Sequence, residues 1–458
     1  MKMKGTVSDA CHSVKVVEGS AAFQDVIDNH IYEQTLTQKS AFFVADLGVV
    51  LWQHVRWRTH MDWIRPFYPV KSNSSPVIIE LLAALGTGFI CASKRELELV
   101  RGLGVSSKDI ILSSLCKQLS QIKYAAKNGI DLLVCDNEVE LRKIARSHPG
   151  AKLLLQVAVM TGCQEEEETA MSLGCSLKDC RHLLECAKEL SLQVSGVKFQ
   201  IPRHCQDPEV YTHAVSDARC VFDMGEELGF QMHILDIGGG FGDTEDMLQK
   251  AKRAVKPILD VYFPPSTGVS VIAEPGAYYV SAAFTLAVNI ITKKMVARDC
   301  SNDSQDRVSA DDEPEFQYYM NDGVYGSFAY KLLEDSIPAP SVHKGAMYLQ
   351  VVSAEEPLFS SSLWGPSSDG LDRVVEHCLL PELSVGDWLL FSNAGANSLG
   401  TLSCHGEEHI PHIYYTISAG DWYEIQNSGI ILDTTMKSIS LVHCLPSTLP
   451  KDSVSSPA

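Results

Sequence analysis

Eight short runs of β-favouring residues recur along the sequence, and longer segments of helical periodicity separate them. This alternation is typical of β/α units that build a parallel sheet. Eight units over roughly 220 residues fit a closed (β/α)8 barrel, typically ~250 residues, better than an open doubly wound sheet, the alternative left open by the pattern. The runs are residues 64–72, 86–93, 109–114, 131–136, 151–159, 194–201, 234–241 and 270–276.

The helical pattern between the runs fades after Pro275, where strand-like runs with few helices follow. We therefore expect a second, all-β domain, with open loops at 299–315 and 341–356. The expected helices are 76–85, 94–103, 116–129, 137–148 and 176–191. The expected domain division is an N-terminal segment 1–45 that contributes to the β domain, a barrel 46–283, a β domain 284–425 and a partly ordered tail 426–458.

Charge and cysteine usage exclude several classes of function. The net charge of -19 argues against nucleic acid or an anionic membrane as partner. Fourteen cysteines without a C-x-x-C pair indicate neither a disulfide framework nor a metal site. The start lacks an apolar leader, and the longest apolar stretch, 278–291, is too short to span a bilayer. We expect a soluble cytoplasmic protein, with the nucleus as a second location.

Three features stand at strand ends, where barrel enzymes carry their chemistry. Lys71 lies at the end of the first run and is a candidate Schiff-base amine, although most lysines at such positions are merely solvated. Gly238, Gly239 and Gly240 lie at the end of the seventh run, where a backbone free of side chains can approach a phosphate or simply turn. Glu274 ends the eighth run. Amine, glycine loop and carboxylate together describe a pyridoxal phosphate site, with the carboxylate facing the pyridinium nitrogen.

Several long segments carry a family resemblance that spans about residues 10 to 425. The chain resembles the eukaryotic ornithine decarboxylases, which implies a pyridoxal phosphate barrel plus a β domain of the alanine racemase-like type. The segments are RPFYPVKSNSSP, LDIGGGF, IAEPGAYYVSAAFTLAVNII, MNDGVYGSF, SSSLWGPSSDGLD and PELSVGDWLLF.

The resemblance divides the family's functional positions into retained and lost ones. The retained positions are the Schiff-base Lys71, the phosphate-loop Gly238, Gly239 and Gly240, the pyridinium partner Glu274, and Asp369, a substrate-amine carboxylate offered across a dimer. The lost positions are Ala277 for the phosphate arginine, Asn397 for the phosphate tyrosine, Gln200 for the stacking histidine, Ser368 for the catalytic cysteine, Leu333 and Glu334 for the substrate-binding Tyr-Asp pair, and Ile90 for a supporting aspartate.

These losses predict a protein without catalytic activity. A charge-assisted hydrogen bond is worth roughly 1.5 to 3 kcal/mol, so losing the phosphate arginine alone weakens cofactor binding by about one to two decades. A serine hydroxyl at Ser368 is also a poor replacement for a thiol in proton transfer. We therefore expect no catalytic residues, no metal, and pyridoxal phosphate binding that is lost or weak.

A retained fold with a dismantled site resembles the antizyme inhibitors, the noncatalytic branch of this family. That resemblance implies antizyme as partner and residues 116–148 as the contact region. This region contains six basic and four acidic residues, and its local charge of +2 suits an acidic partner. The predicted antizyme-binding residues are Lys117, Lys123, Lys127 and Lys143; an ordinary solvated helix pair is the alternative.

Two other functions stay open at this point. The chain could be a pyridoxal phosphate decarboxylase with an altered substrate, because Leu333 and Glu334 replace the substrate-binding pair. It could also act only as a dimerisation partner of ornithine decarboxylase. For the chain itself we expect mostly monomer or a weak homodimer, because Ser172 replaces an interface lysine that faces the counterpart of Asp372 in the enzymes.

Overall fold

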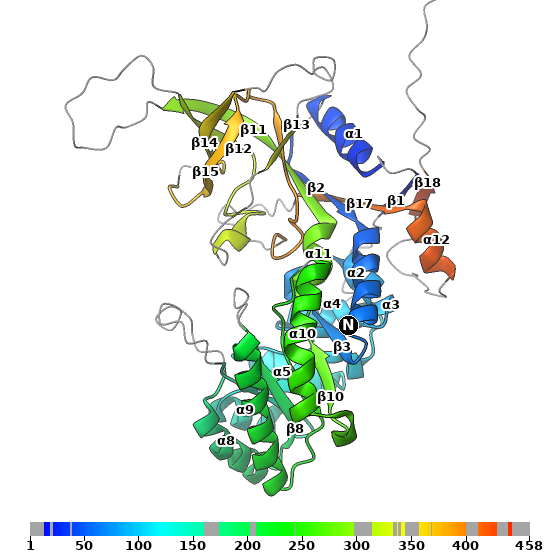
Figure 1. The fold of residues 1–458 in the computed structure, drawn as a ribbon, viewed down its shortest axis with the longest axis vertical. Coiled ribbons are helices and arrows are strands. Elements are labelled where there is room, and N and C mark those ends of the chain that lie inside the picture. The colour runs from blue at the N-terminus through cyan, green and yellow to red at the C-terminus, as the bar shows by residue number, and fades with distance from the viewer. Residues whose placement is uncertain are drawn as a thin grey trace, which may run out of the picture.

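The computed structural model divides into a helix-rich barrel and a β-sheet region next to it (Figure 1). It describes residues 13–18, 22–36, 39–159, 174–201, 208–242, 244–296, 314–332, 337, 340–343, 357–367, 369–399, 411–427 and 438–441.

The barrel is closed by eight parallel strands in the order β10-β3-β4-β5-β6-β7-β8-β9, which confirms the predicted (β/α)8 architecture over the open sheet. Most of the strand residues are buried, as expected for a parallel sheet covered by helices. The strands are β3 (Ile64–Pro69), β4 (Gly88–Cys91), β5 (Ile110–Leu112), β6 (Leu132–Cys135), β7 (Lys152–Val157), β8 (Gln193–Phe199), β9 (Ile234–Asp236) and β10 (Ser270–Ala273).

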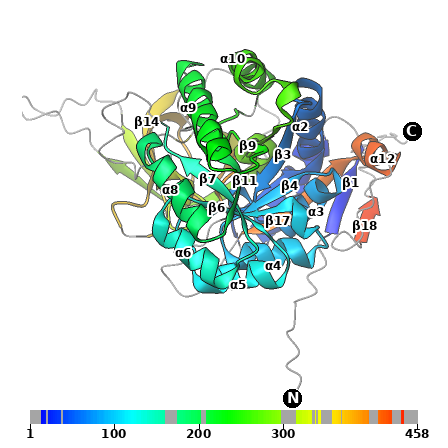
Figure 2. The same ribbon diagram turned by 90° about the horizontal axis from the view of Figure 1, so that it is seen from below.

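A ring of helices surrounds these strands (Figure 2). The five helices predicted from periodicity form within a few residues of their expected ends. Local capping sets some of those ends, because the side chains of Ser93 and Asn137 accept hydrogen bonds from the first turns of α4 and α6. The helices are α2 (Leu47–His60), α3 (Pro76–Ala84), α4 (Lys94–Gly102), α5 (Leu119–Lys127), α6 (Glu138–Ser147), α8 (Leu177–Glu189), α9 (Pro208–Glu227) and α10 (Glu245–Tyr262).

The β region is one ten-stranded sheet with the main order β15-β14-β12-β11-β2-β17-β1-β18, and β16 and β13 branch from β11. Both early strands, β1 and β2, belong to this sheet and not to the barrel. The strands are β1 (Ser13–Val17), β2 (Phe42–Asp46), β11 (Phe284–Val296), β12 (Glu315–Met320), β13 (Ser341–His343), β14 (Leu358–Trp364), β15 (Arg373–Pro381), β16 (Trp388–Phe391), β17 (His412–Ser418) and β18 (Ser438–Leu441).

Some expectations for the C-terminal half need correction. Both expected loops overlap strands. Glu315, at the end of the first loop, begins β12, and Ser341–His343, at the start of the second, form β13. The remainder of the two loops, 299–313 and 344–356, lies outside the described residues. Most of the predicted tail does too, although α12 (Ala419–Asn427) reaches its start and β18 lies within it. The exact domain boundaries stay a prediction.

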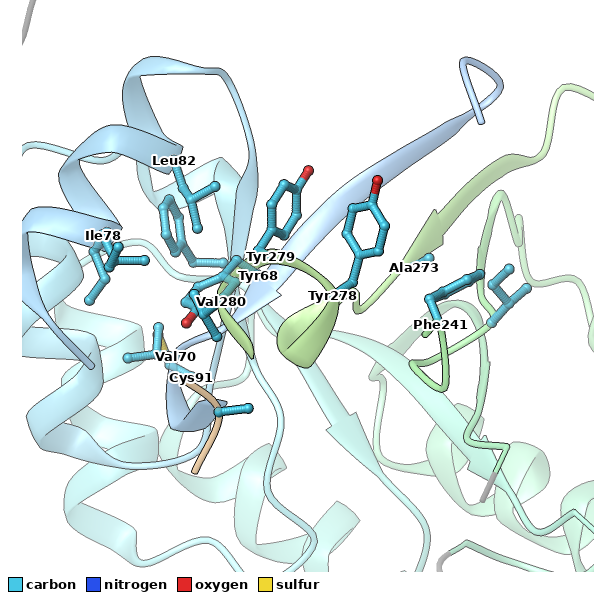
Figure 3. Packing of buried hydrophobic residues seen from close by; sticks show 14 of the residues in the cluster. Tyr68, Val70, Ile78, Leu82, Cys91, Phe241, Ala273, Tyr278, Tyr279 and Val280 are labelled. Carbon is cyan, nitrogen blue, oxygen red and sulfur yellow. The ribbon is translucent and has the colours of Figure 1, made fainter. Parts of the chain in front are cut away.

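The barrel and the sheet share one hydrophobic core. Tyr278 and Tyr279 of α11 (Gly276–Val280) are buried near Tyr68 of β3, where the chain leaves the barrel (Figure 3). Hydrogen bonds fix the same junction, since Asn73 Nδ2 donates to the Gly395 carbonyl at 2.9 Å. No helix among the described residues is long and apolar enough to cross a membrane.

Candidate functional site

A cavity of about 1090 Å³ lies at the C-terminal ends of the barrel strands. The structure brings most of the predicted site residues together there. Those that line it are Lys71, Ile90, Gln200, Gly239, Gly240, Glu274 and Ala277. Loops that follow several different strands therefore converge on one space, as the barrel architecture requires.

Lys71 lies in η1 (Val70–Ser72), a single 3-10 turn directly after β3. Its neighbours Val70 and Ser72 are buried, whereas Lys71 itself is exposed toward the cavity. Gly276 permits this close packing, because a Cβ atom there would lie 2.1 Å from Ser72 Oγ. The turn thus presents an amine at the cavity mouth.

The glycine loop follows β9 and adopts a conformation that favours glycine. Gly238 and Gly240 have φ angles of 69° and 100°. A Cβ atom at Gly238 would lie 2.5 Å from the Phe199 carbonyl oxygen. The loop's backbone is already engaged, however, because Gly239 N–H donates to Gln200 Oε1 at 3.3 Å. The Gln200 side chain thus occupies the Gly239 N–H, a hydrogen-bond donor that a phosphate would otherwise use.

Glu274 is buried beside a cation that the sequence reasoning missed. Lys198 of β8 places its Nζ 2.5 Å from Glu274 Oε1 and also donates to Ser113 Oγ at 2.9 Å. Burial alone would lower the pKa of Lys198, but the charges of Glu274 and Asp236 raise it above its usual value. A lysine within the apolar run VSGVKFQI was the available signal.

Asp236 completes this buried cluster. Burial, followed by the charge of Glu274, raises the pKa of Asp236 well above its usual range. Its Oδ1 accepts a hydrogen bond from Gly238 N–H at 2.9 Å, whereas Oδ2 is buried without a donor. A proton on Asp236 would satisfy that oxygen by donation to Glu274.

The two residues at the positions of the lost phosphate ligands carry no charge. Ala277 is uncharged, and Asn397 has a left-handed φ of 58° with its N–H donating to the Ser72 carbonyl at 2.7 Å. Lys250 and Arg253 of α10 also line the cavity. Lys71 suits pyridoxal phosphate, but the engaged Glu274, the engaged glycine loop and Ala277 fit it poorly.

Asp369 lies away from this cavity, in the loop between β14 and β15. It is exposed and accepts a hydrogen bond from the Tyr325 hydroxyl. Hydrogen bonds from the Leu371 backbone and from Tyr325 lower the pKa of Asp369. Ser368, Glu334, Leu333 and Ser172 lie outside the described residues. Within one chain, then, Asp369 and Lys71 do not share a site.

The predicted antizyme-binding lysines do not all lie on the surface, which corrects the sequence interpretation. Lys117 is 2% exposed; it donates to the Val134 carbonyl and lies 3.6 Å from Glu140 Oε2. It precedes α5 and turns inward, so it cannot contact a partner. Lys143 is half-buried and paired with Glu140. Of these four lysines, only Lys123 and Lys127 on α5 are exposed.

The same two helices expose apolar side chains. Leu119 in the first turn of α5 is 50% exposed, and Val139 in the first turn of α6 is 73% exposed. Both helices follow barrel strands, so their first turns lie at the end of the barrel where the cavity opens. In the sequence, the family resemblance and the charged residues pointed to residues 116–148, and the exposed apolar pair was missed.

One group of possible metal ligands also converges near α6. Glu138 Oε2 lies 3.4 Å from His182 Nε2, which lies 3.6 Å from Cys186 Sγ. His182 and Cys186 stand four apart on one helix, a spacing that the sequence reasoning passed over. Glu138 is also paired with Arg142, and a structural zinc site commonly has four protein ligands.

Comparisons with known proteins agree with this geometry. Residues 47–281 match the family described as pyridoxal-dependent decarboxylase, pyridoxal binding domain. Antizyme inhibitor 1 of Mus musculus is 54% identical over 95% of each chain, and that of Pongo abelii is 53% identical over 100% of each. Ornithine decarboxylase of Mus musculus is 47% identical over 92% of this chain and 90% of the enzyme.

A solved structure shows the same fold. Arginine decarboxylase of Paramecium bursaria Chlorella virus, bound to agmatine, is 27% identical with a TM-score of 0.73, covering 85% of this chain and 100% of the enzyme.

Proposed function

The chain belongs to the pyridoxal-dependent decarboxylase family, and we propose that its function is regulatory: it binds antizyme and keeps it from ornithine decarboxylase. The observation that carries this proposal is the higher identity to proteins named antizyme inhibitor 1, 54%, than to ornithine decarboxylase, 47%. Sequestering antizyme would spare the decarboxylase from degradation and promote polyamine synthesis and uptake. Ornithine decarboxylase itself is a further candidate partner.

Catalytic activity and firm cofactor binding are, in this proposal, absent. Glu274 is paired with Lys198 instead of being open to a ring nitrogen, which supports the proposal. Ala277 offers no charge to a phosphate group. In the relatives' chemistry, pyridoxal phosphate supplies the electron sink for decarboxylation. Without it the side chains of the cavity have no equivalent group, so binding to a protein partner remains the better-supported role.

We assign the antizyme contact to the surface formed by α5 and α6, and name it the α5/α6 surface. Leu119 and Val139 offer apolar contact, and Lys123 and Lys127 stand one turn apart on α5 to attract an acidic partner. Among the described residues neither lysine forms an ion pair within the chain, so replacing them leaves no buried charge behind. Lys117 is excluded because it is buried.

The test is a charge reversal on this surface. Lys123→Glu with Lys127→Glu should weaken antizyme capture at least about tenfold, because two attractive charges become repulsive. Binding is measured by titration with purified antizyme, and circular dichroism should stay unchanged. The control is Lys250→Glu with Lys252→Glu on α10, across the barrel from α5, where the change also breaks the exposed pair of Lys250 with Asp246 (Figure 2). Equal binding by both double variants would refute the assigned surface.

A competition experiment tests the function itself. Added chain should release ornithine decarboxylase from a preformed complex with antizyme, in proportion to its concentration. If it captures no antizyme at any concentration, the regulatory function is wrong, whichever surface is involved.

One observation favours a second function, a decarboxylase with an altered substrate. Lys71 still faces the cavity of about 1090 Å³. If this function is correct, the purified protein has a visible absorbance band that borohydride bleaches, with covalent labelling at Lys71. The regulatory proposal predicts no such band.

A further inference from the structure

Two side chains of β8 and its end, Lys198 and Gln200, already make the contacts that a pyridoxal phosphate molecule would make. We propose that they are built-in occupants of the cofactor site: Lys198 takes the place of the ring cation at Glu274, and Gln200 takes the phosphate-binding N–H of the glycine loop. This inference does not depend on antizyme binding.

The placement follows from strand geometry. Side chains two residues apart on a strand point to the same face. Lys198 and Gln200 therefore both point into the barrel, and both line the cavity. Lys198 is 4% exposed, with its amine between Glu274 Oε1 and Ser113 Oγ at 2.5 and 2.9 Å. The ammonium group is thus fully engaged inside the barrel.

Charge balance makes this arrangement exclusive. Lys198 Nζ lies 2.5 Å from Glu274 Oε1, and both side chains are buried, so each of the two groups is the other's charge partner inside the barrel. A pyridinium ring at Glu274 would add a second cation beside Lys198. Displacing Lys198 instead would leave its charge buried without a partner, which is strongly unfavourable. In both cases the pyridinium ring competes with the Lys198 ammonium group for Glu274.

Gln200 acts at the other end of the site. Its Oε1 accepts from Gly239 N–H at 3.3 Å, and its Nε2 donates to the Ile201 carbonyl at 3.2 Å. A Cβ atom at Gly238 would lie 2.7 Å from Gln200 Oε1, so the amide rests against the loop. A phosphate that bound there would first have to displace this side chain.

Restoring the lost arginine alone should therefore fail to restore binding. We expect Ala277→Arg to improve pyridoxal phosphate affinity by less than about threefold, because both ends stay occupied. Adding Lys198→Ser and Gln200→His should improve affinity at least about tenfold over Ala277→Arg. Equilibrium dialysis with pyridoxal phosphate measures both. Equal affinity of the single and the triple variant would overturn the proposal.

A second measurement, thermal unfolding, does not depend on cofactor binding. It tests the proposal even if the triple variant does not fold. Lys198→Met and Glu274→Gln should each lower Tm by at least about 5 °C without any cofactor, because each leaves a buried charge unpaired. The double variant should lose less than the sum of the two.

The control for this series is Lys256→Met, which breaks the exposed pair with Asp260 and should change Tm by no more than about 1 °C. If Glu274→Gln raises Tm, or if the losses of Lys198→Met and Glu274→Gln are additive, the two residues are not partners and the proposal is wrong.

Discussion

His54 of α2 is buried against Tyr279, with its Nδ1 3.0 Å from the tyrosine hydroxyl. Burial, followed by the charge of Arg58, lowers the pKa of His54 from 6.5 to about 4. The folded protein therefore holds this imidazole neutral at a pH where an unfolded chain would already protonate it. The stability that His54 contributes is complete above pH 6.5 and is lost as the pH falls toward 4.

This gives a prediction at the residue scale. Between pH 7 and pH 4.5 the wild-type free energy of unfolding should fall by up to ~3 kcal/mol from this group. His54→Gln removes the titrating ring, so its stability should depend less on pH in this range. Urea unfolding at several pH values measures the difference. His233→Gln, at an exposed histidine, should keep the wild-type slope; an unchanged slope in His54→Gln would contradict the assignment.

The location of a single residue could be predicted where it follows from the position of that residue in the barrel, and not where it depends on the contacts of its side chain. Lys71 and Glu274 follow barrel strands, so topology alone brought them to one cavity. The prediction that Lys117 binds antizyme was wrong. Its long side chain turns inward to a backbone carbonyl of β6, and no local sequence pattern reveals that contact. Lys198 was not singled out at all, because only the fold brings it next to Glu274, a carboxylate at the end of another strand.

At the scale of elements, α5 and α6 form a surface with an apolar part as well as a charged one. Leu119 and Val139 are both largely exposed, so their side chains add little to the fold. A bound partner would remove these apolar side chains from water, and that burial would stabilise the complex.

We expect Leu119→Ser with Val139→Ser to weaken antizyme binding at least about tenfold, since two apolar contacts are worth roughly 1.5 kcal/mol or more. The same variant should keep its Tm within about 2 °C because neither side chain is in the core. Titration calorimetry and thermal unfolding measure the two effects. Leu379→Ser, at an exposed leucine of β15, is the matched control; similar binding by both variants would remove the apolar pair from the contact.

Elements were predictable to different degrees. The eight barrel strands are short apolar runs between amphipathic helices, and that contrast located each of them. β13 and β15 were missed in the sheet region. β13 has three residues, and β15 mixes exposed and buried positions without clean alternation, because only part of it faces the core.

At the scale of the whole molecule, the described carboxylates of the predicted dimer contact are held within the chain. Asp372 is buried and accepts hydrogen bonds from Val324 N–H at 2.7 Å and Ser367 N–H at 3.0 Å. Asp369 is held by Tyr325. Since both groups already have partners in their own chain, a second copy gains less by pairing with them.

The resulting prediction concerns assembly. Light scattering over a dilution series should give mostly the monomer mass at low micromolar concentration, with a dimer only at higher concentration. Related ornithine decarboxylase, measured alongside, serves as the reference for a protein of similar size. A mass that stays dimeric down to nanomolar concentration would contradict a weak dimer.

The sheet order has a consequence for how the chain is made. The Thr416 hydroxyl donates to the Ala45 carbonyl across a separation of 371 residues. On the ribosome, β2 is therefore synthesised long before β17, its parallel neighbour, exists. The barrel can close once β10 has emerged, while β1 and β2 remain unpaired edges that invite association with other nascent chains. A premature stop before residue 412 would remove β17, the strand that joins β1 to β2, so the shortened product should become a substrate for chaperones and proteases.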